Sequence, residues 1–312
     1  KVVFPGDNLF VKPDFAIGDE QSINGLLNHL DGFNDKSFEN ISHIALINGH
    51  ITSLREAADN SHVHTLEEFA IKHQISNYFQ IGKSGECGCL LAENGLIMPG
   101  NFAISTDRHI IGYGAVGALA TGVSAAEMAD TWINGSVRIS VPESAKIVLS
   151  GSFQPLVTPK DLALHLLAML GKKGAKGLSL EISGDAVTQL DISARFTLAN
   201  LLVESGARFV HLPIDEQVLK FLKVERDDLA FSQYLPDSDA EYKWTREISL
   251  DEIVPMAATP GSPVNGVPAR DVGYVKVNQV IIGSCTNGNI EDFRQVRQLV
   301  GSRKISKDVR FH

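Results

Sequence analysis

The chain has 312 residues, of which 44% are hydrophobic and 21% charged, which suffices for two or three packed domains. A formal net charge of −9 argues against nucleic acid as a partner, because phosphate contacts require clustered lysine and arginine. No apolar run approaches the roughly 18 residues that span a bilayer, and no signal-peptide pattern opens the chain, so we expect no membrane partner. The three cysteines do not suit a disulfide framework, which favours a reducing, cytoplasmic location.

The first part of the chain alternates predicted helices and strands. Residues 22–30 form an amphipathic stretch, and residues 65–74 predict a helix that begins at a capping box of Thr65 and Glu68. Short apolar runs predict strands, at residues 43–48, 77–81, 102–105 and 137–140. Residues 114–132, rich in alanine and glycine, predict one long helix suited to close packing or to the wall of a site.

The same alternation continues to residue 223. Predicted strands at 146–150, 178–182 and 208–212 alternate with predicted helices at 158–170, 191–205 and 215–223. Pro159 and Asp161 favour the start of the first of these helices, and Gly171 favours its end. Strands and helices at this spacing predict α/β layers with largely parallel sheets.

The last part of the chain is less regular. Residues 225–254 are acidic, and residues 255–266, rich in proline, glycine and serine, predict a linker. A strand at 275–282, a helix at 290–300 and a strand beginning at residue 309 follow. Because the chain stops within this last strand, we expect a fragment. We divide it into α/β domains at 1–143 and 144–250 and an incomplete third domain at 251–312.

The strongest local motif is Val-Ile-Ile-Gly-Ser-Cys-Thr-Asn-Gly at residues 280–288, followed by Glu291 and Asp292. A buried strand ends at Cys285, and a turn leads from it into a helix. A thiol near a helix N-terminus has a lowered pKa and suits a metal ligand or a nucleophile. By itself, the pattern is more typical of a buried cysteine at the end of a strand.

Residues 282–292 resemble the first cysteine motif of the aconitase and isopropylmalate dehydratase family, in which that cysteine binds a [4Fe-4S] cluster. The resemblance covers nearly the whole chain. It includes Pro5–Asp7, Glu93–Gly95 with Pro99 and Gly100, Asp107–His109, Gly114–Gly122, Val141–Glu143 and Arg195–Gly206. It implies an aconitase-like multi-domain fold of α/β/α layers, with the cluster in a cleft between domains.

The resemblance also implies roles for single residues. Cys285 would be a cluster ligand, and His50 corresponds to the histidine of the family's Asp-His pair. Asp107 and His109 would orient the proton-transfer network and the substrate. Asn200 and Glu204, one helical turn apart, would lie near the cluster, where a carboxylate helps to handle the leaving hydroxyl.

The implied function is that of a hydro-lyase acting on a hydroxy di- or tricarboxylate similar to 3-isopropylmalate. One cluster iron would act as a Lewis acid on the substrate hydroxyl. In the family, a serine on a swivelling domain removes the proton, and this domain is often a separate small subunit. The resemblance therefore implies such a partner, and it places the two remaining cluster cysteines, a C-x-x-C pair, beyond residue 312.

The sequence departs from the family pattern at four positions. Gly49 replaces the aspartate of the Asp-His pair, Gly88-Cys89 stands in place of His-Gln, Arg108 replaces a serine, and Gly18 replaces a histidine or glutamine. These changes predict an altered substrate or a weakened or lost activity. Arg108 suits either a bidentate grip on a carboxylate or phosphate or a structural ion pair with Asp107.

Two other functions fit parts of the sequence. Residues 112–117 match G-x-G-x-x-G after two isoleucines, and Glu143 follows the next predicted strand, as in a nicotinamide-dependent dehydrogenase. Against this alternative, Asp107, Arg108 and His109 occupy the place of a buried apolar strand. The losses at Gly49 and Gly88 also suit a non-catalytic family member that serves as a scaffold or binding subunit.

Overall fold

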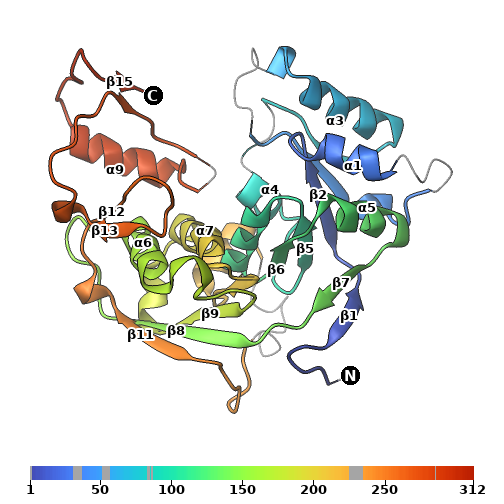
Figure 1. Ribbon diagram of the computed structural model, residues 1–312, viewed down its shortest axis with the longest axis horizontal. Coiled ribbons are helices and arrows are strands. Elements are labelled where there is room, and N and C mark those ends of the chain that lie inside the picture. The colour runs from blue at the N-terminus through green and yellow to red at the C-terminus, as the bar shows by residue number, and fades with distance from the viewer. Residues whose placement is uncertain are drawn as a thin grey trace.

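Two parallel β-sheets lie side by side and form the body of the molecule (Figure 1). The computed structural model of the protein describes residues 2–30, 37–50, 57–82, 85, 87–224, 235–284 and 286–312. None of the helices within these ranges is long and apolar enough to cross a membrane.

The first sheet has five parallel strands in the order β4-β3-β2-β5-β6. The strands are β2 (Phe15–Asp19), β3 (Ile44–Ile47), β4 (Asn77–Phe79), β5 (Phe102–Ser105) and β6 (Leu119–Gly122). The helices α1 (Ile23–Leu30), α3 (Ser61–Lys72) and α5 (Ala125–Asn134) cover one face, at the upper right of Figure 1. Ala16 and Leu46 pack towards these helices, whereas Ile17 and Ile47 belong to a second apolar core on the other face. Burial on both faces explains why these strands are almost wholly apolar.

The second sheet has four parallel strands in the order β10-β9-β8-β11. They are β8 (Ser144–Ser150), β9 (Ser179–Ser183), β10 (Phe209–His211) and β11 (Thr245–Ser249). The accompanying helices are α6 (Pro159–Leu170), α7 (Ile192–Leu201), which continues as the 3-10 segment η6 (Leu202–Ser205), and α8 (Glu216–Leu222). Buried residues of both sheets contribute to the same large apolar core.

Two short elements fill the space between the sheets: α4 (Cys87–Glu93) and the 3-10 segment η3 (Arg108–Val116). The backbone of η3 packs very closely on β10, because an added Cβ at Gly114 would lie 1.9 Å from the carbonyl oxygen of Val210. The amide of Leu212 also donates to the carbonyl of Gly114 at 3.1 Å. This contact fixes η3, and with it Asp107 at its N-terminus, at the junction of the two sheets.

The remaining strands form three separate two-stranded sheets. The strands β1 (Asn8–Val11) and β7 (Val137–Ser140) form an antiparallel ribbon, and β12 (Met256–Ala258) and β13 (Gly266–Pro268) form a hairpin against α6. The C-terminal unit contains α9 (Ile290–Val300) and the parallel pair β14 (Gln279–Val280) and β15 (Arg310–Phe311). It lies beside α6 and α7 at the upper left of Figure 1.

The predicted class, α/β layers with largely parallel sheets, is confirmed. Four local predictions are wrong. The strand predicted at residues 275–282, expected to be buried, is reduced to β14, and Ile281 beside it is 66% exposed. Residues 114–132 are not one helix, because left-handed Gly117 ends η3 and strand β6 precedes α5. The helix predicted to begin at Thr65 begins at Ser61, where Asn60 provides the cap and Thr65 donates to the carbonyl of Ser61. The predicted linker contains the strands of a hairpin. The division at residues 143 and 250 stays a proposal, and residues 225–234 lie outside the described ranges.

Candidate functional site

The carboxyl ends of β2, β3 and β5 meet at one edge of the first sheet, the position where ligands bind in open α/β sheets. An open cavity of about 540 Å³ lies at this edge. Residues from the segments that follow each strand line it: Asp19, Gln21, Ser22, His50, Thr106, Asp107, Arg108 and His109. The sheet thus brings four of the residues predicted from the sequence, His50, Asp107, Arg108 and His109, to one cavity.

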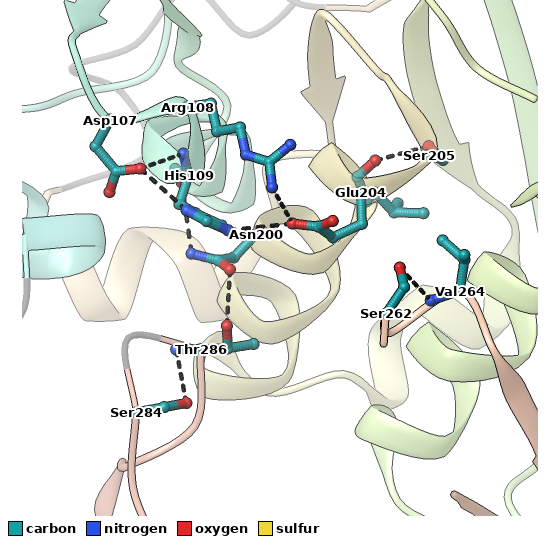
Figure 2. Close-up of polar contacts among 11 residues, drawn as sticks. Asp107, Arg108, His109, Asn200, Glu204, Ser205, Ser262, Val264, Ser284 and Thr286 are labelled. Carbon is teal, nitrogen blue, oxygen red and sulfur yellow. Dashed lines mark hydrogen bonds and ion pairs between the residues drawn. The ribbon is translucent and has the colours of Figure 1, made fainter. Parts of the chain in front are cut away.

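Asp107 orients His109. It caps η3 by accepting from the His109 backbone amide at 2.9 Å, and the same oxygen lies 3.0 Å from His109 Nδ1 (Figure 2). The hydrogen bond to Asp107 raises the pKa of His109, although burial opposes the shift. Burial by itself would raise the pKa of Asp107, but its bonds to the His109 side chain and amide outweigh burial and lower it. The pair therefore favours a protonated imidazole beside an ionised carboxylate.

Glu204 lies on the opposite side of the His109 ring. Its Oε1 is 3.6 Å from His109 Nε2 and 2.5 Å from Arg108 Nη2 (Figure 2). The ion-pair partner of Arg108 is thus Glu204 and not Asp107, the partner considered from the sequence. The Arg108 side chain is 59% exposed, so most of its guanidinium faces solvent at the cavity.

Asn200 connects this cluster to the turn around Cys285. Its Nδ2 donates to the carbonyl of His109 at 3.5 Å, and its Oδ1 accepts from Thr286 Oγ1 at 2.9 Å (Figure 2). Asn200 also borders a second, smaller cavity, of about 80 Å³. The other residues around that cavity are Gly88, Cys89, Phe196, Ser284, Thr286, Gly288 and Asn289. Cys285 itself lies outside the described residues.

His50 reaches the first cavity from the segment after β3. Its Nδ1 lies 3.1 Å from Glu20 Oε1, and Glu20 is buried at the carboxyl end of β2. The hydrogen bond to Glu20 raises the pKa of His50 to about 9. Sequence reasoning missed Glu20, because residues 15–19 were not predicted as a strand. The sequence contains the signal, an apolar run that ends in two acidic residues.

Comparison with known proteins places the chain in a family. The sequence profile of the Aconitase family (aconitate hydratase) matches residues 45–274. The 3-isopropylmalate dehydratase large subunit of Acetivibrio thermocellus is 35% identical over 308 residues, which cover 99% of this chain and 73% of that protein. The chain belongs to the aconitase family. Its enzymatic class is that of a hydro-lyase, an enzyme that removes and adds water.

Two further relatives are also 3-isopropylmalate dehydratase large subunits. The large subunit from Clostridium kluyveri is 35% identical over 305 residues, or 98% of this chain and 72% of the relative. The one from Lachnoclostridium phytofermentans is 38% identical over 267 residues, or 86% of this chain and 63% of the relative. The family resemblance inferred from the motifs is therefore confirmed.

A [4Fe-4S] cluster is typical of the aconitase family, and the site fits one only in part. Such a cluster is held by several thiolates. Among the described residues, no group of three or more His, Cys, Asp or Glu side chains could hold a metal. The described residues instead supply a wall, which consists of the second cavity with Cys89 at its side and the Asn200–Thr286 hydrogen bond.

The dehydrogenase alternative is wrong. The first two glycines of the G-x-G-x-x-G match lie in η3, a buried 3-10 segment, and the third, Gly117, is its C-cap. The element that follows is strand β6 rather than a helix. Gly114 is needed for contact with Val210, and Gly117 adopts a left-handed conformation with φ of 75°. These glycines serve packing in an aconitase-family fold.

Proposed function

We propose that this chain is a hydro-lyase subunit that acts on a hydroxy di- or tricarboxylate similar to 3-isopropylmalate. One observation carries the proposal: His109 lies between the carboxylates of Asp107 and Glu204, with the Arg108 guanidinium at the same cavity. The relatives named 3-isopropylmalate dehydratase large subunit support the substrate class and a small partner subunit.

Loss of water from a hydroxy acid requires that the departing hydroxyl gains a proton. We assign this transfer to His109, whose protonated form Asp107 favours and whose Nε2 lies beside Glu204. Glu204 would handle the hydroxyl that leaves. The base that takes the carbon-bound proton would be a serine of the small subunit.

Two cationic groups would bind the substrate carboxylates. Arg108 contacts Glu204 through Nη2, and a guanidinium has five N–H donors, so further donors remain for a carboxylate. His50, with its raised pKa, is cationic at neutral pH and lines the same cavity. Thr106 Oγ1 is buried there and has no hydrogen-bond partner within the described ranges, so it offers a polar group to a ligand.

Cys285 would contribute one ligand to a [4Fe-4S] cluster, and the Asn200–Thr286 bond would hold the adjoining turn. A bound cluster supplies a Lewis-acidic iron that eases departure of the hydroxyl. Cys285→Ser should remove the visible absorption of the cluster, and full retention of iron and sulfide in that variant contradicts the ligand assignment.

The function is tested with the full-length protein, combined with a small subunit under anaerobic cluster reconstitution and assayed on isopropylmalate, citrate, homocitrate and simpler hydroxy acids. We expect turnover of a hydroxy diacid only with both subunits present. Arg108→Gln should raise KM about 10–100-fold, because a charged hydrogen bond contributes about 1.5–3 kcal/mol. Arg138→Gln, a change at an exposed arginine on β7, is the control. Absence of turnover on every substrate would support the non-catalytic alternative.

A further inference from the structure

Glu20 is a buried acid whose carboxylate, among the residues that the structure describes, accepts hydrogen bonds from one turn. Only 1% of it is exposed, and both carboxylate oxygens accept hydrogen bonds. Oε2 accepts from the Gly49 amide at 3.2 Å, and Oε1 accepts from the His50 amide at 3.0 Å and lies 3.1 Å from His50 Nδ1. A buried carboxylate is costly unless it is paired and hydrogen-bonded. All three donors come from Gly49 and His50, so Glu20 is matched to this turn.

The arrangement determines which ring nitrogen of His50 can act in the cavity. Because Nδ1 is engaged by Glu20, Nε2 is the nitrogen that remains for a group bound among the cavity residues. Gly49 has no side chain, and the family pattern has an aspartate at this position. The neighbouring strand β2 supplies a carboxylate instead.

We propose that Glu20 is a positioning residue for His50, which it holds as an oriented cation whose Nε2–H binds a carboxylate of the substrate. The role in binding rests on the proposed function, whereas the orientation and charge of His50 do not.

The other charged groups around His50 do not explain its charge. Asp19 on β2 lies next to Glu20, but its carboxylate accepts from the Ser22 amide at 2.8 Å, and burial raises its pKa. Asp107, from the loop after β5, is paired with His109. Arg108 and His109 also line the cavity and act against a cation. Among the described charged groups, Glu20 alone accepts a hydrogen bond from the His50 ring, and this bond is the largest cause of the raised His50 pKa.

The test is a histidine NMR titration of the whole chain, which needs neither substrate nor cluster. His50→Gln identifies the His50 resonance among the ten histidines. In the wild type, we expect a midpoint near 9 and an Nδ1 shift typical of a hydrogen bond to a carboxylate. Glu20→Gln should lower the midpoint by about 1–2 units, because the acceptor loses its charge. Asp19→Asn, the matched change at the adjacent buried acid, should move it by less than about 0.5 unit.

A wild-type midpoint at or below 6.5 would overturn the proposal, even where no variant folds. Equal shifts in Glu20→Gln and Asp19→Asn would overturn it as well, because both nearby carboxylates would then raise the His50 pKa equally, without a specific role for the Glu20 hydrogen bond. In the active complex, Glu20→Gln should move the alkaline limb of kcat/KM to lower pH. An inactive complex with a normal His50 titration would count against the proposed function and leave the Glu20–His50 relation intact.

Discussion

Each of two histidines at the open cavity is bonded through Nδ1 to a carboxylate: His50 to Glu20, and His109 to Asp107. The same histidine–carboxylate pair therefore occurs twice at one edge of one sheet, on segments that follow different strands. In both pairs the carboxylate stabilises the imidazolium form. Together with Arg108, which pairs with Glu204, the two histidines place three cationic hydrogen-bond donors at the cavity, each held by a carboxylate.

The Glu20–His50 pair predicts a pH dependence of stability. Folding raises the pKa of His50 from 6.5 to about 9. Protonated His50 therefore stabilises the fold fully below pH 6.5, and this stabilisation is lost as pH rises through about 9. Burial alone would raise the pKa of Glu20, but hydrogen bonds from His50 outweigh burial and lower it from 4.5. Ionised Glu20 therefore stabilises the fold fully above pH 4.5, and this stabilisation is lost as pH falls. The difference in unfolding free energy between wild type and Glu20→Gln should therefore peak between pH 4.5 and 6.5. Urea denaturation from pH 4 to 10 measures it; a difference that stays constant over this range would contradict the pair.

Asp107→Asn separates the charge of Asp107 from its capping role. Asparagine can still accept the His109 amide as an N-cap, but the carboxylate that raises the His109 pKa is lost. We expect the His109 pKa to fall and kcat to drop about 10²–10⁴-fold, the usual effect of losing a positioned acid or base. Asp191→Asn, the same change at the N-cap of α7, should alter neither. Unchanged kcat in Asp107→Asn would remove His109 from the proposed mechanism.

The predicted and the missed parts of the site differ in the kind of signal they leave in the sequence. Asp107, His109, Asn200 and Glu204 occur in motifs, so resemblance identified them. Glu20 follows β2 and its partner His50 follows β3, so the contact is recognisable only once these two strands are paired in register. The Arg108–Glu204 contact, which joins residues 96 positions apart, likewise depends on the packing of η3 against α7.

At the scale of elements, local signals identified most helices and strands. The capping box of Thr158 and Asp161, with Gly171 at the other end, delimits α6 as predicted. The prediction of one helix at residues 114–132 was wrong because its glycines and alanines were interpreted as helix-packing residues. Gly114 instead permits backbone contact with a strand almost 100 residues away, and Gly117 permits a left-handed turn. Such requirements come from tertiary contacts and leave no periodic pattern.

Two glycines of η3 provide a matched test of this interpretation. Gly114→Ala would place a methyl group 1.9 Å from the Val210 carbonyl oxygen, so η3 and β10 must separate, at a cost of about 1–3 kcal/mol or more. At Gly112 the nearest atoms lie 3.7 Å from an added Cβ, which is ordinary contact. Gly112→Ala should therefore be neutral or slightly stabilising. Urea denaturation compares the two variants, and equal stabilities would contradict the close packing of η3 on β10.

At the scale of the whole molecule, burial is distributed unevenly. The two sheets share one large apolar core, whereas α9 contributes no buried residue. Polar bonds from α7 hold the C-terminal unit. Thr197 Oγ1 donates to the Thr286 carbonyl at 3.3 Å and accepts from Asn287 Nδ2 at 3.1 Å, and Asn200 accepts from Thr286. Segments with few buried apolar contacts open most readily, so the proposed cluster wall should open before the sheets do.

Thr197→Val tests this dependence with a side chain of similar shape that can make neither bond. Thr197 is 2% exposed, so the valine methyl group stays buried, and the loss is mainly that of two hydrogen bonds. At about 0.5–1.5 kcal/mol each, their loss should speed amide exchange in α9 by roughly tenfold or more. Exchange in β8 and β9 should not change. Hydrogen–deuterium exchange with mass spectrometry measures both regions in one experiment, and Thr188→Val, at an exposed threonine bonded to the Asp185 carbonyl, is the control. If α9 already exchanges as slowly as α6 in the wild type, or does not respond to Thr197→Val, then apolar contacts rather than these polar bonds hold the C-terminal unit.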